Sequence, residues 1–149
     1  MAKLPPNPLQ TEILKAVSNA KTKEQKIKLL QDHRTHALVS LFIWNYDESI
    51  ESALPEGEVP FTPNAAPTPD AQSKLVSEYR TLYNFVKGGN DRLSQSRREQ
   101  LFIELLEALH PDEAELLCLV KDRSLGKKYK ITHNTVKEAY TDIEWGNRK

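Results

Sequence analysis

The last third of the chain, residues 101–145, constrains the fold more than any other part. It contains three apolar patterns with helical spacing. Pro111 stands where a helix can begin, because a first helical residue needs no amide donor. Asp112 and Glu113 follow it and suit the positive end of a helix dipole. From Asp112 to about Lys121 the pattern is apolar around most of the helix circumference, so this helix is expected at the centre of the fold.

The first 46 residues predict three short helices, each preceded by a residue that can accept a hydrogen bond from the first turn. The clearest signal is Thr22 with Gln25 three positions later, which together form a capping box. Helices joined by so few residues pack antiparallel. Residues 8–46 are therefore predicted to form a three-helix unit. The predicted helices span about residues 8–19, 23–32 and 36–46, and their caps are Asn7, Thr22 and Thr35.

Residues 47–72 have a different composition, with five prolines among alanine, threonine, asparagine and glutamate. Each proline lacks an amide donor and biases the residue before it towards extended geometry. The segment predicts a long proline-rich loop, with one helical turn over residues 49–54. Val59 and Phe61 are expected to anchor the loop to the body of the protein.

After the loop, Asp70 is expected to cap a helix that a pair of glycines ends at residues 88–89, because glycine is favoured just beyond a helix C-terminus. The apolar residues of this helix recur at helical spacing and form one continuous face. They are Leu75, Val76, Tyr79, Leu82, Tyr83 and Val86.

Two further caps complete the pattern. Ser96 and Glu99 form a capping box that opens a helix over residues 97–109, and Thr132 caps a last helix after a turn over residues 124–130. No β alternation of useful length is present.

The predicted fold is all-α, a compact bundle of about seven short helices with a long proline-rich loop. Residues 1–149 are expected to form a single helical domain. It would contain the N-terminal unit 8–46, the loop 47–72 and a C-terminal bundle over residues 73–145.

Charge and hydropathy limit the classes of partner that the protein is expected to bind. The 21 basic and 21 acidic residues cancel, so no global field draws the chain to nucleic acid or to an anionic membrane. The N-terminus lacks the apolar stretch of a signal peptide, and the longest apolar run is far short of a membrane span. We expect a soluble, intracellular protein without a membrane partner.

No motif in the chain carries a reaction. It has no H-E-x-x-H, no glycine-rich phosphate loop, no G-x-S-x-G and no carboxylate-rich calcium loop. Cys118 is the only cysteine, and its apolar neighbours predict a buried, inert thiol. The expectation is a non-enzymatic protein with no catalytic residue, no metal and no cofactor.

One hypothesis for the function is nucleic-acid binding by residues 123–137. The segment from Ile131 resembles the start of a recognition helix in bacterial helix-turn-helix domains. The preceding connection is short by about five residues for that motif, and the alternative is a solvated, lysine-rich link between two core helices. The candidate residues are Arg123, Lys127, Lys128, Lys130, His133, Asn134 and Lys137.

A second hypothesis is binding to another protein, and elimination of the other classes favours it. The proline-rich loop and the C-terminal tail are the segments that a helical core needs least. Ile143 and Trp145 in the tail could dock into a groove of a partner, with Trp145 as the anchor. Alternatively they fold back over the end of the bundle. Val59 and Phe61 are the corresponding candidates in the loop.

The C-terminal pattern also carries a resemblance. Residues 109–129, LHPDEAELLCLVKDRSLGKKY, and 131–145, ITHNTVKEAYTDIEW, are similar to the end of a family of small uncharacterised proteins of large tailed phages, especially marine and cyanobacterial ones. The segments IKLLQ at 27–31 and LPEGEVPF at 54–61 resemble it as well. Tyr140 and Thr141 stand where the family commonly has Phe-Pro. The resemblance implies a phage accessory protein in the host cytoplasm that binds a host or phage protein, and it supplies no site residues.

Overall fold

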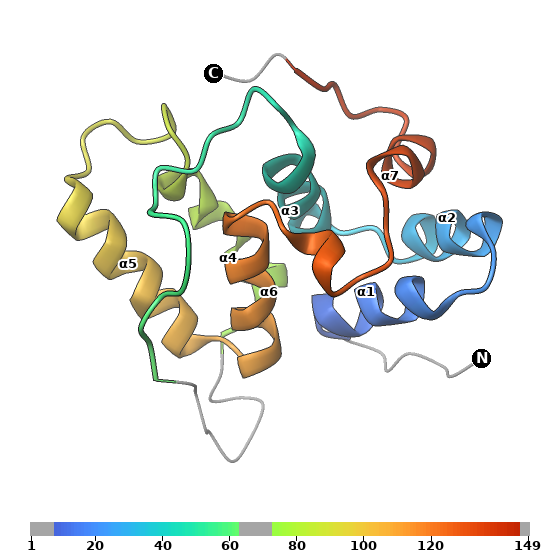
Figure 1. Ribbon diagram of the computed structural model, residues 1–149, viewed down its shortest axis with the longest axis horizontal. Coiled ribbons are helices and arrows are strands. Elements are labelled where there is room, and N and C mark those ends of the chain that lie inside the picture. The colour runs from blue at the N-terminus through green and yellow to red at the C-terminus, as the bar shows by residue number, and fades with distance from the viewer. Residues whose placement is uncertain (1–7, 63–72, 147–149) are drawn as a thin grey trace.

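The computed structural model describes residues 8–62 and 73–146. Within these ranges the chain forms seven α-helices and two 3₁₀-helices and contains no strand, only two isolated β-bridges (Figure 1). The predicted all-α fold is confirmed. The α-helices are α1 (Gln10–Asn19), α2 (Lys23–Asp32), α3 (His36–Tyr46), α4 (Leu75–Glu78), α5 (Gln95–Ala108), α6 (Pro111–Lys121) and α7 (His133–Ala139), and the 3₁₀-helices are η2 (Tyr79–Phe85) and η3 (Leu125–Lys127).

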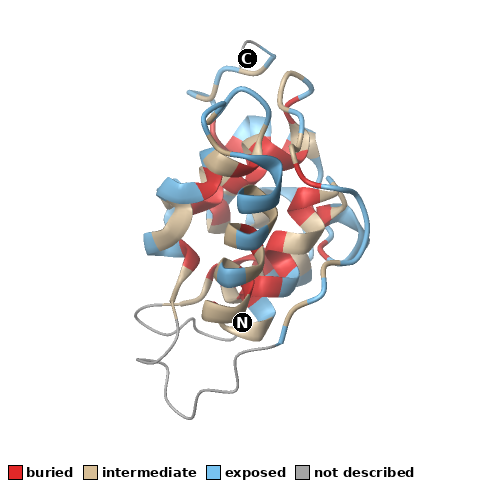
Figure 2. Cartoon of the chain, turned by 90° about the vertical axis from the view of Figure 1, so that its left-hand side faces the viewer, coloured by how far each residue is buried: buried red, intermediate tan, exposed pale blue. Residues whose placement is uncertain are grey.

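Helix α6 lies in the interior, as its all-round apolar pattern predicts, and packs against α1, α3 and α5. Its residues Leu116, Leu117 and Val120 are fully buried. Helix α5 lies at one end of the molecule and α2 with α7 at the other, with α3, α4 and α6 between them (Figure 1). Buried residues gather on the inward sides of the helices and exposed residues on the outer sides (Figure 2). Burial of these apolar stripes is the main stabilising contribution to such a fold.

The last helix returns to the N-terminal helices. Helix α7 packs chiefly on α2 and not on the helices that directly precede it. Just after α7, the buried Tyr140 hydroxyl donates a hydrogen bond to the Leu30 carbonyl at 2.7 Å. An ion pair between Lys23 and Glu138 joins the same two helices at the surface. The structure thus groups α7 with α1 and α2.

The caps confirm part of the sequence reading. Thr22, Thr35 and Thr132 each accept a hydrogen bond from the backbone N–H three positions later. Of the predicted helix caps, Ser96 is wrong and Asn7 is not tested. Helix α5 is capped by Ser94 and not by Ser96. Helix α1 begins at Gln10 after Leu9, while the predicted cap Asn7 lies outside the described residues.

The predicted long helix after the loop is wrong. Only Leu75–Glu78 is α-helical, and the chain then tightens into the 3₁₀-helix η2. A 3₁₀-helix has three residues per turn, so Tyr79, Leu82 and Phe85 share one face. Leu82 and Phe85 are buried, whereas Tyr83 is 53% exposed. Phe85 packs edge-on to Phe102, with ring centroids 5.1 Å apart. The predicted cap Asp70 lies outside the described residues.

The described part of the proline-rich loop is held along α5 and α6. The predicted helical turn at residues 49–54 is absent, because Ser52 instead pairs with Val86 in an isolated bridge. The Thr62 N–H donates to the Glu107 carboxylate of α5 at 2.8 Å. The buried Lys121 ammonium of α6 donates to the Pro55 carbonyl at 2.7 Å. Backbone groups of the loop are therefore satisfied by side chains of the body.

In the described residues, no helix combines the length and the apolar character that a membrane crossing requires.

Candidate interaction surface

The first turns of four helices meet at one buried carboxylate. Glu113, in the first turn of α6, is 1% exposed. Its Oε2 accepts the backbone N–H of Gln10 at 2.8 Å, and its Oε1 accepts that of Leu75 at 3.0 Å. The Gln10 side chain in turn accepts the hydroxyl of Thr35, the cap of α3, at 2.6 Å. One acidic side chain thus fixes the starts of α1 and α4 against α6, and Thr35 adds the start of α3.

The pKa of Glu113 is raised, because burial outweighs the contacts that favour its charged form. Burial raises the pKa of its carboxyl group, because the charged form loses water. The two backbone donors, followed by the charges of His110 and Lys74, oppose this rise. A buried carboxylate that accepts backbone N–H groups satisfies donors that a helix start leaves free. The sequence predicted only a helix-dipole role for this residue.

An open cleft of about 240 Å³ lies over this junction. Its apolar walls come from α1 and α4, and its polar rim comes from the link between α2 and α3 and from the start of α4. The walls include Leu9, Ile13 and Val76, and the rim is formed by His33, Arg34 and Lys74.

Exposed apolar side chains continue from the cleft along η2. Among the described residues, the large hydrophobic side chains that are exposed are Val76, at 42%, and Tyr83, at 53%. Between them the Tyr79 ring stacks on His36, with centroids 5.7 Å apart, and the Arg80 guanidinium lies 5.8 Å from the centre of the Tyr79 ring. We call this set, together with the cleft, the α4–η2 surface.

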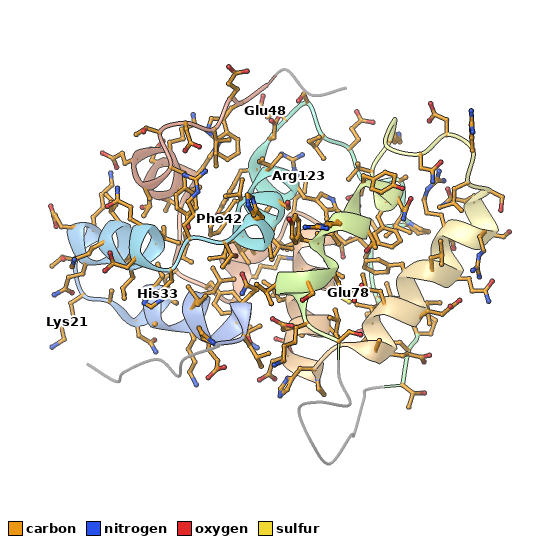
Figure 3. All side chains as sticks on the ribbon, turned by 180° about the vertical axis from the view of Figure 1, so that it is seen from behind. Lys21, His33, Phe42, Glu48, Glu78 and Arg123 are labelled. Atoms are coloured by element: carbon orange, nitrogen blue, oxygen red, sulfur yellow. The ribbon has the colours of Figure 1, made fainter. Side chains whose placement is uncertain are left out.

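Figure 3 looks onto this side of the molecule. The segment with Glu78 lies at the centre in front, and α1 with His33 lies beside it. Charged groups around the cleft and η2 have both signs: Arg34, Lys74 and Arg80 against Glu78, the buried Glu113 and Asp142. Arg34 is bound to the carboxylate of Asp142, so Lys74 and Arg80 are the cations of this set that form no ion pair among the described residues.

The C-terminal tail is packed against the protein, which agrees with the fold-back alternative. Ile143 and Trp145 are both half-buried. The Trp145 ring lies edge-on to His133, with centroids 4.4 Å apart, and His133 stacks on Tyr46 at 5.0 Å. The Gly146 N–H donates to both carboxylate oxygens of Asp47 at 3.1 Å. The tail therefore lies over the ends of α3 and α7.

His133 contacts both of these rings and is half-buried. Its Nε2 is buried and is the one buried side-chain nitrogen or oxygen of the described residues that lacks a hydrogen-bond partner. Burial lowers the pKa of the imidazole, and the charge of Lys137 lowers it further. The charges of Asp47 and Glu48 act in the opposite direction.

The loop candidates lie elsewhere. Val59 and Phe61 are half-buried and pack against the hydrophobic core. The structure does not bring them together with Ile143 and Trp145, because the loop follows α5 while the tail covers α3 and α7 (Figure 1).

The structure divides the seven residues of the nucleic-acid hypothesis. Arg123 donates to the carbonyls of Asp47 and Ile50, both at 2.7 Å, and has a left-handed backbone with φ of 55°. Lys128 pairs with Glu115. Trp145 covers His133. The remaining four are exposed: Lys127, Lys130, Asn134 and Lys137.

The connection before α7 agrees with the lysine-rich link that the sequence allowed as an alternative, because its Lys127, Lys128 and Lys130 are exposed, and apolar side chains anchor it. Leu125 and Tyr129 are buried within it. It holds only the three-residue helix η3, where a helix-turn-helix motif requires a full helix. Helix α7 has seven residues and packs on α2.

The described residues contain no group of three or more His, Cys, Asp or Glu side chains that could hold a metal ion. Cys118 is only half-buried, not fully buried as predicted. Burial still raises the pKa of its thiol to about 11, so the reactive thiolate is scarce near neutral pH.

The sequence reading assigned Val76, Tyr79 and Tyr83 to the core, and so missed them as surface residues. It assumed an α-helical period throughout residues 70–88. After Glu78 a period of three joins Tyr79, Leu82 and Phe85, so that Leu82 and Phe85 face inward while Tyr83 faces outward. A test of both periods would have found the exposed tyrosine.

Comparison with known proteins gives one match. Residues 13–127 match the model of a protein family described as a family of unknown function, DUF6433. No curated protein and no solved structure matches the chain.

Proposed function

The chain belongs to DUF6433, a family of unknown function, and we propose that it acts by binding another protein through the α4–η2 surface. Binding, and not catalysis, is the activity proposed. The resemblance of residues 109–129 to proteins of large tailed phages supports a host or phage protein as the partner, in the cytoplasm of an infected bacterium.

The observation that carries the proposal is the placement of the exposed apolar side chains. Val76 and Tyr83 are on the same short segment, and Val76 lines the cleft. Single exposed apolar residues are ordinary on protein surfaces, but an exposed apolar side chain that borders a concavity, as Val76 does, marks a candidate interaction site. Tyr83 lies seven residues further along the same segment. Tyrosine and arginine are also enriched where interfaces are strongest. The α4–η2 surface contains both residue types, in Tyr79, Arg80 and Tyr83.

The tail is a weaker candidate for the partner site. Trp145 and Ile143 already bury part of their surface on the protein itself, and Gly146 is tied to Asp47. A partner that took Trp145 as its anchor would first have to break these contacts. On the α4–η2 surface, Val76 and Tyr83 are already exposed.

Site-specific crosslinking tests the proposal. A photo-reactive phenylalanine derivative replaces Tyr83 in the full chain, and the protein is irradiated in lysate of the cells in which it is naturally made. We expect one discrete crosslinked protein. Val76→Glu in the same chain should remove that product, because it places a charge in the apolar contact.

The matched control carries the same derivative at Lys28 on α2, whose side chain is 77% exposed. Recovery of the same product from both positions would show non-specific capture. Absence of any discrete product from position 83 would reject the α4–η2 surface as the binding site.

A further inference from the structure

We infer that the α4–η2 surface takes an acidic peptide segment with one large apolar side chain as its anchor. The inference rests on the proposed function and adds the chemistry of the partner. Three features of the surface carry it: the size of the cleft, the sign of the charge around it, and the way Arg34 already holds a carboxylate.

The size of the cleft limits how large the apolar anchor of the partner can be. Its volume of about 240 Å³ lies below the roughly 300–1,000 Å³ of pockets that enclose drug-sized ligands. Leu9, Ile13 and Val76 make its walls apolar. A single Leu, Phe or Trp side chain suits this space, and the flanking residues of the segment would then lie along the rim.

The charges on the rim set the sign of the flanking residues. Lys74 and Arg34 line the cleft together with Glu113, whose carboxylate is buried and accepts two backbone N–H groups. No ion pair joins Lys74 to another residue within 8–62 and 73–146. Arg80 adds a cation beside Tyr79. A segment with carboxylates next to its anchor would meet these cations, whereas a basic segment would be repelled.

Arg34 shows how such a carboxylate is held. Its Nη1 and Nη2 donate to Oδ1 and Oδ2 of Asp142, both at 2.7 Å, which is the bidentate geometry that arginine favours. The pair is exposed, with 40% and 62% of the two side chains accessible, so water competes with it. An acidic partner can take the place of Asp142. The tail residue is then an internal competitor for the same cation.

The probes are three synthetic peptides of equal length: one with a central Trp between glutamates, one with the same Trp between lysines, and one with Ala between glutamates. Each is titrated into the full chain and followed by backbone amide NMR shifts. We expect only the glutamate–Trp peptide to shift the amides around the cleft, and its binding should weaken as salt is added.

Three variants make the test specific. Lys74→Glu should weaken binding of the glutamate–Trp peptide by about tenfold or more, as expected for loss of one charge-assisted contact. Lys74→Ser is the second variant, because serine is a favourable cap at the start of α4 and keeps the helix start intact. Asp142→Asn should tighten binding by freeing Arg34. Lys28→Glu makes the same charge change on α2 and should leave the affinity unchanged.

Each outcome separates the partner chemistry from the proposed function. Equal binding of the lysine–Trp peptide would overturn the acidic partner, and equal binding of the glutamate–Ala peptide would overturn the apolar anchor. Absence of any shift near the cleft would overturn both parts of the inference. In all three cases the crosslink from position 83 decides independently whether the surface binds a protein.

Discussion

Glu113 of α6 accepts the backbone N–H of Gln10, a residue 103 positions earlier, at 2.8 Å. The second oxygen of the same carboxylate accepts the N–H of Leu75. A helix start normally satisfies such donors with a nearby side chain or with water. Here a third helix supplies the acceptor, so the floor of the cleft and the direction of α1 and α4 depend on one residue.

Replacement of this carboxylate should destabilise the protein. Glu113→Gln keeps the shape of the side chain, but its NH₂ group cannot accept a hydrogen bond, so one of the two backbone N–H donors loses its acceptor. The variant should lower the free energy of unfolding by about 1–3 kcal/mol. Glu113→Ala should lower it further, because both donors then lose their acceptor. Urea unfolding followed by circular dichroism measures the change. Glu115→Gln, on the exposed side of the same helix, should change it by about 0.5 kcal/mol or less. An equal effect of the two Gln variants would refute the bridging role of Glu113.

His133 should make stability sensitive to mild acid. Its pKa is lower in the folded protein than in the unfolded chain, chiefly because of burial. The unfolded chain therefore binds a proton first as the pH falls below about 6.5, and stability decreases through that range. His133→Phe keeps a ring between Tyr46 and Trp145 but cannot titrate. The fall in stability between about pH 7.5 and pH 5.5 should be smaller in the variant, and identical falls in thermal unfolding would contradict the assignment.

The tail should detach when its aromatic contact is removed. Trp145→Ala deletes the ring that lies against His133, and should increase hydrogen exchange at the Gly146 amide that donates to Asp47. The loss of unfolding free energy should be about 1 kcal/mol, because the ring is only half-buried. Glu144→Ala, at an exposed neighbouring position, is the control and should leave exchange unchanged. Unchanged exchange in Trp145→Ala would mean that the ring does not hold the tail.

Binding to nucleic acid should be weak or absent. Arg123, Lys128 and His133 are engaged within the protein, and the chain has no net positive charge. Titration with mixed-sequence duplex DNA at low salt, where phosphate contacts are strongest, should show no saturable binding. Binding that is lost in Lys127→Glu plus Lys128→Glu, and that falls steeply with salt, would restore the nucleic-acid hypothesis.

Local signals in the sequence predicted much of the fold. Thr22, Thr35 and Thr132 cap their helices because the chemistry of a cap involves only the next few residues. Between Leu75 and Phe85 the same reasoning failed, because the apolar spacing fits both 3.6 and 3.0 residues per turn. In the structure the chain forms the tighter helix there, with Phe85 packed on Phe102. That contact is long-range and leaves no local trace.

The candidate site was harder to predict than the fold. Its cleft exists because Glu113 meets Gln10 and Leu75, and no spacing rule links these three positions. The sequence instead directed attention to the tail and the loop, where apolar residues stand among polar ones. Ile143, Trp145, Val59 and Phe61 all pack against the core, which apolar residues in terminal and loop segments commonly do when a groove is available.

The packing of α7 on α2 has a consequence for how the protein is made. During synthesis α2 leaves the ribosome about a hundred residues before α7, and until then it packs on α1 but lacks its contact with α7. Chains released early by premature termination would lack that contact and would be substrates for chaperones and proteases. The closing contact between Tyr140 and Leu30 thus separates finished molecules from incomplete ones.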